Sequence, residues 1–311
     1  MEQTKAPDTN PSEEWADLPW RKLEQHLYRL QKRIFKASAR GDLKTVHKLQ
    51  KLVMKSRSAR LLAVRRVTQE NQGKKTAGVD GVKSVTPVGR LALAEAIHPK
   101  RMKQKKPKPL RRVWIPKPGK AEQRPLGIPV MVDRACQAVA KQALEPQWEA
   151  LFETDSYGFR PGRSAHDAIA AIFNNIRYKS KYVLDADIKG CFDNINHQAL
   201  LEKLRTYPAM RRLVKGWLKA GVMDGMDFSP TLAGTPQGGV VSPLLANIAL
   251  FGMEEALINA YMDGKKTLSA RQGAPKLIRY ADDVRHLTHN EILLAEKEGS
   301  EESDLRVISP T

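Results

Sequence analysis

The chain has 311 residues, 41% of them apolar, and its 53 Lys and Arg against 34 Asp and Glu give a formal net charge of +19. This length and apolar content predict a sizeable folded core, while no apolar run approaches the roughly 18 residues that cross a membrane. The polar N-terminus lacks the apolar stretch of a secretory signal, and only Cys136 and Cys191 are present, so we expect an intracellular protein with reduced thiols. The positive charge indicates a polyanionic partner, most simply nucleic acid, over a merely soluble basic protein.

Helices are predicted over residues 15–71, after residues 1–14, which we expect to be disordered. Apolar residues recur every three or four positions on both sides of Gly41 and Asp42, which predicts amphipathic helices. Gly41 is expected to end one helix and Asp42 to cap the next. The polar faces carry many Lys and Arg, and we favour a surface that contacts RNA or DNA over a merely solvated one.

A glycine-rich connector over residues 72–82 leads toward a strongly basic segment. Between Lys100 and Arg124, eleven Lys and Arg face one acid, Glu122. Because Pro and Gly interrupt this segment, we expect an extended loop or strand pair and not a charged helix face. A basic arm that contains Trp114 suits phosphate contacts and nucleotide stacking.

From residue 111 onward, short strands mix with helices. Strands are predicted over 111–117, 124–130 and 181–188, and helices over 132–151 and 242–257, the latter with Ser242 as its N-cap. The order of elements is neither a parallel βαβ array nor a repeat. It indicates an α+β fold.

Two groups of aspartates carry the chemistry. Asp185 and Asp187 share one face of the strand over 181–188, because side chains alternate along a strand, and Asp282 and Asp283 stand side by side at an expected hairpin turn. Taken alone, the first pair is more often a salt-bridged strand end and the second a solvated turn. If the strand and the hairpin are neighbours, however, the carboxylates converge and can bind Mg²⁺, and the metal relieves their mutual repulsion. A pair of such ions about 4 Å apart supports phosphoryl transfer.

Several segments carry a family resemblance. DADIKGCFDNI, GTPQGGVVSPLLANI, SYGFRPGRSAHDAI and RYADD closely resemble the reverse transcriptases encoded by bacterial and organellar group II introns, and ARLLAVRRVTQENQGKKTAGVDG is similar to that family's N-terminal region. The resemblance runs from about Trp15 to Asp283. It implies an N-terminal helical region over 15–95, then right-hand polymerase fingers and palm over 100–290, with an antiparallel sheet and packed helices. The expected location is the bacterial cytoplasm or an organellar matrix.

The resemblance also implies which residues act. Asp187, Asp282 and Asp283 hold two Mg²⁺ ions, with Asp187 and Asp282 the more essential pair. Phe192 matches the aromatic gate that selects dNTPs against a ribose 2′-OH. Asp193, like Asp185, is left as structural.

Six further residues are expected to contact nucleotide or nucleic acid. Lys117 and Arg124, cations of the fingers, hold the incoming triphosphate. Gln237 touches the template and nascent base pair, and Gly238 lets the backbone approach nucleic acid. Arg160 and Arg163 form the pocket wall or contact the template strand.

After Asp283 the chain departs from the family pattern. An apolar strand and later elements are replaced by a sequence whose last 21 residues, 291–311, hold six acids against two bases. We expect Arg285 and His286 to make the strand after the aspartate pair pack poorly. We also expect a gene truncated or frameshifted before the thumb, and therefore weak polymerase activity or none.

Three functions follow as alternatives. The first is an RNA-directed DNA polymerase that adds dNTPs to a DNA primer on an intron RNA template. The second is a maturase-type splicing cofactor that binds RNA without polymerase activity, and the third is an inactive remnant.

Overall fold

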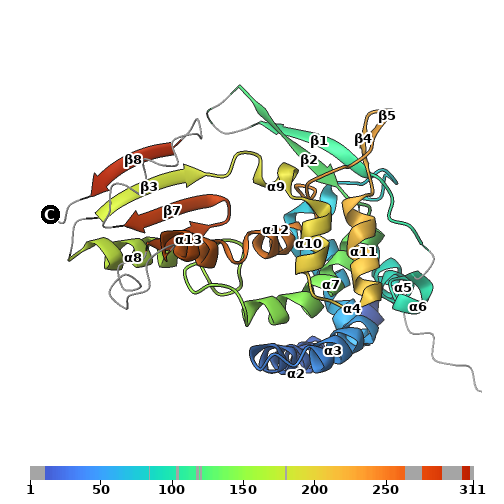
Figure 1. Ribbon diagram of the computed structural model, residues 1–311. Helices are drawn as coiled ribbons and strands as arrows, with labels where there is room; N and C mark the ends of the chain where they lie inside the picture. Colours follow the sequence, from blue (N-terminus) through green and yellow to red (C-terminus); the bar gives the residue numbers. More distant parts are fainter. Residues whose placement is uncertain are drawn as a thin grey trace, which may run out of the picture. The chain divides into compact units, whose positions relative to one another are not determined.

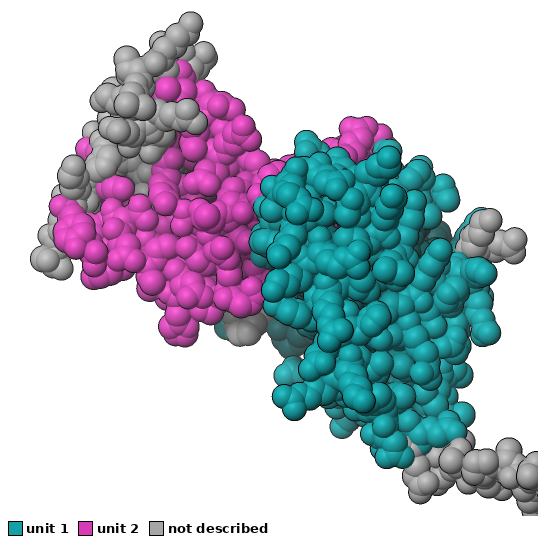
Figure 2. All heavy atoms as spheres, turned by 90° about the horizontal axis from the view of Figure 1, so that it is seen from below, with its two compact units in different colours: residues 1–150, 204–242 teal, residues 151–203, 243–311 magenta. Residues whose placement is uncertain are grey.

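The computed structural model describes residues 11–83, 85–102, 105–116, 119, 121–178, 181–262, 275–288 and 303–308. The chain forms two compact units, unit 1 from residues 1–150 and 204–242 and unit 2 from residues 151–203 and 243–311 (Figure 2). The boundary expected between residues 95 and 100 does not separate these units. No helix of the described ranges is long and apolar enough to cross a membrane.

Unit 1 begins with helices in the predicted region. They are α1 (Pro11–Ala16), α2 (Trp20–Ala39), α3 (Leu43–Lys55), α4 (Arg57–Arg65) and the short turns η1 (Arg66–Glu70) and η2 (Gln72–Lys75). The break at Gly41 and Asp42 is confirmed: Gly41 has a φ of 73°, and the Asp42 carboxylate accepts a hydrogen bond from the Thr45 N–H at 3.0 Å. The expected disorder of residues 1–14 is wrong for residues 11–14, which begin α1, and residues 1–10 lie outside the described ranges.

These helices share a core with α7 (Met131–Glu149), the helix predicted over 132–151. Ser38 donates to the Gln147 carbonyl at 2.8 Å, and the Gln50 amide donates to the Gln147 side chain at 2.6 Å. Two short helices, α5 (Pro87–Ala96) and α6 (Pro99–Met102), lead into the basic segment. The N-terminal helices and the segment after residue 100 therefore belong to one unit.

The sheet of unit 1 contains the predicted strand pair. Strands β1 (Leu110–Pro116) and β2 (Gln123–Ile128) are antiparallel, and β4 (Val222–Asp224) and β5 (Asp227–Ser229) extend the sheet in the order β2-β1-β4-β5. The β4–β5 hairpin, which follows α11 (Pro208–Leu218), was not predicted. Its signal is Asp224-Gly225, a dipeptide typical of tight hairpin turns.

Unit 2 holds an antiparallel sheet of β6 (Lys276–Tyr280), β7 (Asp283–Thr288), β3 (Lys181–Asp187) and β8 (Ser303–Ile308), in the order β6-β7-β3-β8 (Figure 1). Helix α8 (Ala165–Ile176) packs on one face, where Tyr157, Ala168, Val183 and Ile278 form a buried cluster. The short helices α9 (Cys191–Asn194) and α10 (His197–Lys203) follow β3. The α+β fold class is confirmed.

One helix prediction in this region is wrong. The helix expected over 242–257 is two helices, α12 (Ser242–Leu250) and α13 (Met253–Met262). The chain turns between them at Gly252, whose φ of 87° is a left-handed conformation that favours glycine.

Candidate active site

The β6–β7 hairpin and strand β3 bring the three predicted aspartates to one end of the sheet of unit 2. Asp187 lies directly opposite Asp283 in the antiparallel register, so both side chains leave the same face with Cβ atoms about 5 Å apart. Asp282 occupies the turn between β6 and β7, and its carbonyl accepts a hydrogen bond from the Ile188 N–H at 3.3 Å. The fold therefore places all three carboxylates at one corner.

Close packing against Gly158 holds the turn that carries Asp282. Ala281 has a φ of 59°, which is strained for a residue with a Cβ. A Cβ added to Gly158 would lie 2.1 Å from the Ala281 nitrogen, and the Asn247 amide holds the Gly158 carbonyl at 2.8 Å. Only glycine fits at position 158, and this role was not predicted.

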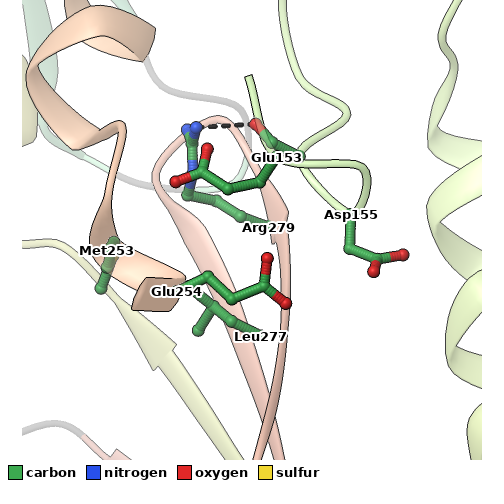
Figure 3. Close-up of a pocket in the computed structure, with 7 residues that line it drawn as sticks. Glu153, Asp155, Met253, Glu254, Leu277 and Arg279 are labelled. Atoms are coloured by element: carbon green, nitrogen blue, oxygen red, sulfur yellow. Dashed lines mark hydrogen bonds between the residues drawn. The ribbon is translucent and has the colours of Figure 1, made fainter. Parts of the chain in front are cut away.

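A buried arginine fixes the base of the same hairpin. Arg279 is 2% exposed, and its guanidinium donates to the Asn247 side chain at 2.9 Å, the Ala281 carbonyl at 2.8 Å and the Ser156 hydroxyl at 2.7 Å. Figure 3 shows its guanidinium beside the Glu153 carboxylate. Burial lowers the pKa of Arg279, and Glu153 opposes that shift. Sequence reasoning missed Arg279, whose signal is a cation directly after the apolar pair Leu277 and Ile278.

The carboxylates repel one another as the site stands. Burial raises the pKa of Asp283, and the charges of Asp282 and Asp187 raise it further, while Arg285 opposes the shift. Burial also raises the pKa of the Cys191 thiol to about 11, with Asp282 and Asp187 contributing in the same direction. A bound cation would relieve this repulsion.

The donor set suits a hard divalent cation, because carboxylate oxygens are the ligands that Mg²⁺ prefers. In the residues the structure describes, no group of three or more His, Cys, Asp or Glu side chains has metal-binding geometry. The fit therefore rests on oxygen chemistry and on the backbone placement of Asp187, Asp282 and Asp283. Ligation requires their side chains to turn toward a common point.

The strand after the aspartate pair forms, although we expected Arg285 and His286 to make it pack poorly. Strand β7 pairs with β3 on one side and with β6 on the other. Val284 is buried, and the Arg285 guanidinium forms an ion pair with Asp185 across the strands. The side chain of His286 lies outside the described part of the chain.

Three other predicted residues, Phe192, Arg160 and Arg163, also belong to unit 2. The Phe192 ring, on α9, meets the Phe159 ring edge-on, with centroids 6.0 Å apart. Arg160 is buried, and its guanidinium donates to the carbonyls of Glu153 and Ser156, both at 2.7 Å.

Arg163 also binds the loop before α8. Its guanidinium donates to the Thr154 carbonyl and lies over the Tyr157 ring at 5.2 Å. Arg160 and Arg163 thus brace the loop that carries Gly158. The template contact expected of them stays a prediction.

The remaining predicted residues belong to unit 1. Lys117 lies outside the described residues, and Arg124 is exposed on β2. The Gln237 carbonyl accepts a hydrogen bond from the Gly127 N–H at 2.7 Å. Gly238 has a φ of 111°, and a Cβ there would lie 3.1 Å from the Gly127 carbonyl oxygen. The close approach that the structure shows at Gly238 is thus to β2, an intramolecular reason for glycine that differs from the nucleic-acid contact we expected.

With this geometry in place, comparisons with known proteins define the class. Residues 15–97 match the N-terminal domain of reverse transcriptase, and residues 115–295 match reverse transcriptase (RNA-dependent DNA polymerase). The chain belongs to the reverse transcriptase family.

Its relatives include proteins encoded by group II introns, which confirms the predicted resemblance. The group II intron-encoded protein LtrA of Lactococcus lactis subsp. cremoris is 34% identical over 63% of this chain and 33% of its own length. Protein YkfC of Escherichia coli is 38% identical over 64% of this chain and 55% of its own. Maturase-like protein 1 of Euglena gracilis is 32% identical over 76% and 51%. The chain thus spans between about a third and a half of these curated relatives.

Proposed function

We propose that this chain is an RNA-directed DNA polymerase that adds dNTPs to a DNA primer on an RNA template, intron RNA in particular. The observation that carries the proposal is the register of Asp187 opposite Asp283, with Asp282 in the adjoining turn. Membership of the reverse transcriptase family supports the same chemistry. We further propose that these carboxylates hold two Mg²⁺ ions.

Asp187, Asp282 and Asp283 would hold these ions, which would supply Lewis acidity for activating a hydroxyl nucleophile and for neutralising charge on the leaving phosphate. The chain's own residues hold the carboxylates in position. Asp187 ends a strand that is paired on both edges, and Asp282 sits in a turn whose backbone is held by Gly158 and Arg279. Because the backbone is fixed before the substrate arrives, little reorganisation is needed when charge develops on the phosphate.

Phe192 is proposed as the gate that selects deoxynucleotides. It lies on α9, five positions after Asp187, and its edge contact with Phe159 fixes the ring. Lys117 and Arg124 for the triphosphate, and Gln237 and Gly238 for the template, stay predictions.

The test is addition of the first nucleotide to oligo(dT) annealed to poly(rA), with enzyme in excess over primer. We expect at least the first dTMP to be added when Mg²⁺ is present and none when it is replaced by EDTA. Scoring the first addition separately from long products isolates the chemistry from processivity. Absence of any Mg²⁺-dependent addition would contradict the proposal.

RNA binding of the maturase type is a second candidate, favoured by the exposed cations of unit 1. Lys100, Arg101, Lys106 and Lys108 are exposed on one short segment. Changing these four to Gln is expected to weaken binding of a structured intron RNA at least tenfold in 0.15 M salt. It should also lower the slope of log K against log salt by about 0.7 to 0.9 per lost phosphate contact.

Asp187→Asn serves as the control for this binding assay, because RNA affinity of this kind is independent of the aspartates. Filter binding across a salt series measures both variants. Equal loss of affinity in the Asp187→Asn chain would argue against a separate RNA-binding function.

A further inference from the structure

Unit 1 contains a cavity of about 410 Å³ that the proposed polymerase chemistry does not use. Its lining comes from α3, α7 and α11, which are labelled in Figure 1, and from residues 97–102 and 105–107. A volume of this size falls in the range of ligand pockets.

The interior of the cavity is apolar and rich in methionine. Met54 and Met210 are buried and Met102 is half-buried, and Leu213 adds a further apolar side chain. Methionine side chains are flexible and polarisable, so a surface built from them adapts to varied apolar partners. The interior therefore suits a bulky apolar side chain.

The rim of the cavity is cationic. Lys51, Lys55, Lys105 and Arg212 are exposed lining residues, and no Asp or Glu lines the cavity. None of these four cations forms an ion pair with another described residue. An anionic partner would therefore meet a complementary charge around an apolar interior.

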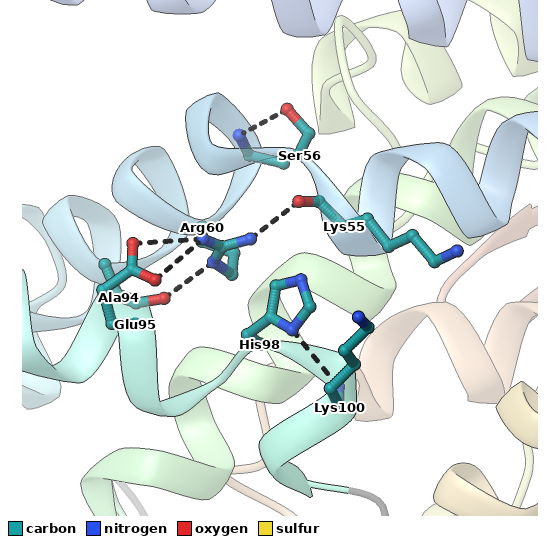
Figure 4. Close-up of polar contacts among 8 residues, drawn as sticks. Lys55, Ser56, Arg60, Ala94, Glu95, His98 and Lys100 are labelled. Atoms are coloured by element: carbon teal, nitrogen blue, oxygen red, sulfur yellow. Dashed lines mark hydrogen bonds and ion pairs between the residues drawn. The ribbon is translucent and has the colours of Figure 1, made fainter.

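The buried Arg60 holds the part of the cavity wall that carries Lys55. Figure 4 shows Arg60 of α4 joining the end of α3 to α5. Its guanidinium is buried and donates to the carbonyls of Lys55 and Ala94, both at 2.7 Å, and it pairs with Glu95 at 3.1 Å. The cavity wall is thus preorganised, which lowers the entropic cost of binding.

We infer that this cavity binds an acidic peptide segment of a partner protein, with an apolar side chain in the methionine-lined interior and carboxylates against the cationic rim. A nucleic acid fits less well, because base recognition by stacking needs an exposed ring. The aromatic residue of the lining, Tyr207, is buried, and its ring already meets His47 at 6.3 Å and the Lys51 ammonium at 5.2 Å. This inference goes beyond the proposed polymerase function and does not depend on it.

The experiment selects displayed random 12-residue peptides on the whole chain and counter-selects on the Ala209→Trp variant. Ala209 is an exposed lining residue on α11, so the indole can block the entrance without disturbing the core. We expect enriched peptides with Asp or Glu flanking Leu or Phe. The probe is then the most enriched peptide, labelled with fluorescein and measured by fluorescence anisotropy.

Three variants decide the outcome. Ala209→Trp and the double variant Lys55→Glu with Arg212→Glu are each expected to raise the Kd at least tenfold. The double variant Lys44→Glu with Lys48→Glu, two exposed residues on the same helix α3 but outside the lining, makes the same change of four charges and should leave the Kd within about twofold. The rim variants alter exposed residues, so they keep the test valid if the tryptophan perturbs folding.

Three results would overturn the inference. The first is the absence of enriched peptides, and the second is enriched peptides whose Kd none of the cavity variants changes. The third is displacement of the peptide by a 15-nucleotide single-stranded RNA whose own binding falls equally in the cavity variants, which would make this a nucleic-acid site.

Discussion

Asp187→Asn is expected to lower the rate of first-nucleotide addition about 10³-fold, which corresponds to about 4 kcal/mol of transition-state stabilisation. The substitution keeps the shape of the side chain but removes the charge that draws a divalent cation to the end of β3. The rate of the Asp282→Asn variant should fall by a similar factor, since the backbone of Asp282 is held in place by Ile188. Single-turnover kinetics on oligo(dT) and poly(rA) measure both.

Asp193→Asn is the matched control for this prediction. Asp193 is an exposed carboxylate on α9, a few residues from Asp187, and we expect its variant to retain activity within about threefold. If Asp187→Asn and Asp193→Asn lowered the rate equally, the effect would come from the loss of any nearby negative charge and not from the proposed site.

Gly158→Ala is expected to have the largest effect on stability. The new Cβ would lie 2.1 Å from the Ala281 nitrogen, and because that nitrogen is a backbone atom, no flexible side chain can move aside to relieve the overlap. Asn247 holds the Gly158 carbonyl and Arg279 holds the Ala281 carbonyl, which limits relaxation. We expect the free energy of unfolding to fall by about 3 kcal/mol or more, measured as the shift in the urea midpoint.

Gly73→Ala provides the comparison, because nothing lies within 4 Å of a Cβ at that position. Its free energy of unfolding should change by less than about 1 kcal/mol. A Gly158→Ala protein as stable as Gly73→Ala would show that the hairpin turn is not held by this contact.

Local patterns predicted much of the fold. Periodicity and the Gly41-Asp42 pair predicted the break between α2 and α3, and the β1–β2 pair followed from alternating strands around a turn. The helix over 242–257 failed because apolar content continues across Gly252, and only the backbone conformation there ends α12. The β4–β5 hairpin was missed although Asp224-Gly225 signals it.

The proximity of Asp187 to Asp283 was expected from two segments taken together and from the family resemblance, because either aspartate group alone is a weak signal; their role as metal ligands stays a prediction. The residues that hold the turn in place were not predicted. Gly158 and Arg279 act through contacts between segments far apart in the sequence, and spacing along one chain gives no access to such contacts. Arg285 looked like a defect in β7 because its partner, Asp185, lies on another strand.

The most direct test of the central claim is Mn²⁺ binding followed by electron paramagnetic resonance, with Mg²⁺ as competitor. The account predicts that the chain binds Mn²⁺, that Mg²⁺ displaces it, and that Asp187→Asn and Asp282→Asn each weaken binding at least tenfold while Asp193→Asn does not. Equal Mn²⁺ affinity in the unsubstituted chain and in the Asp187→Asn, Asp282→Asn double variant would contradict a shared cation site.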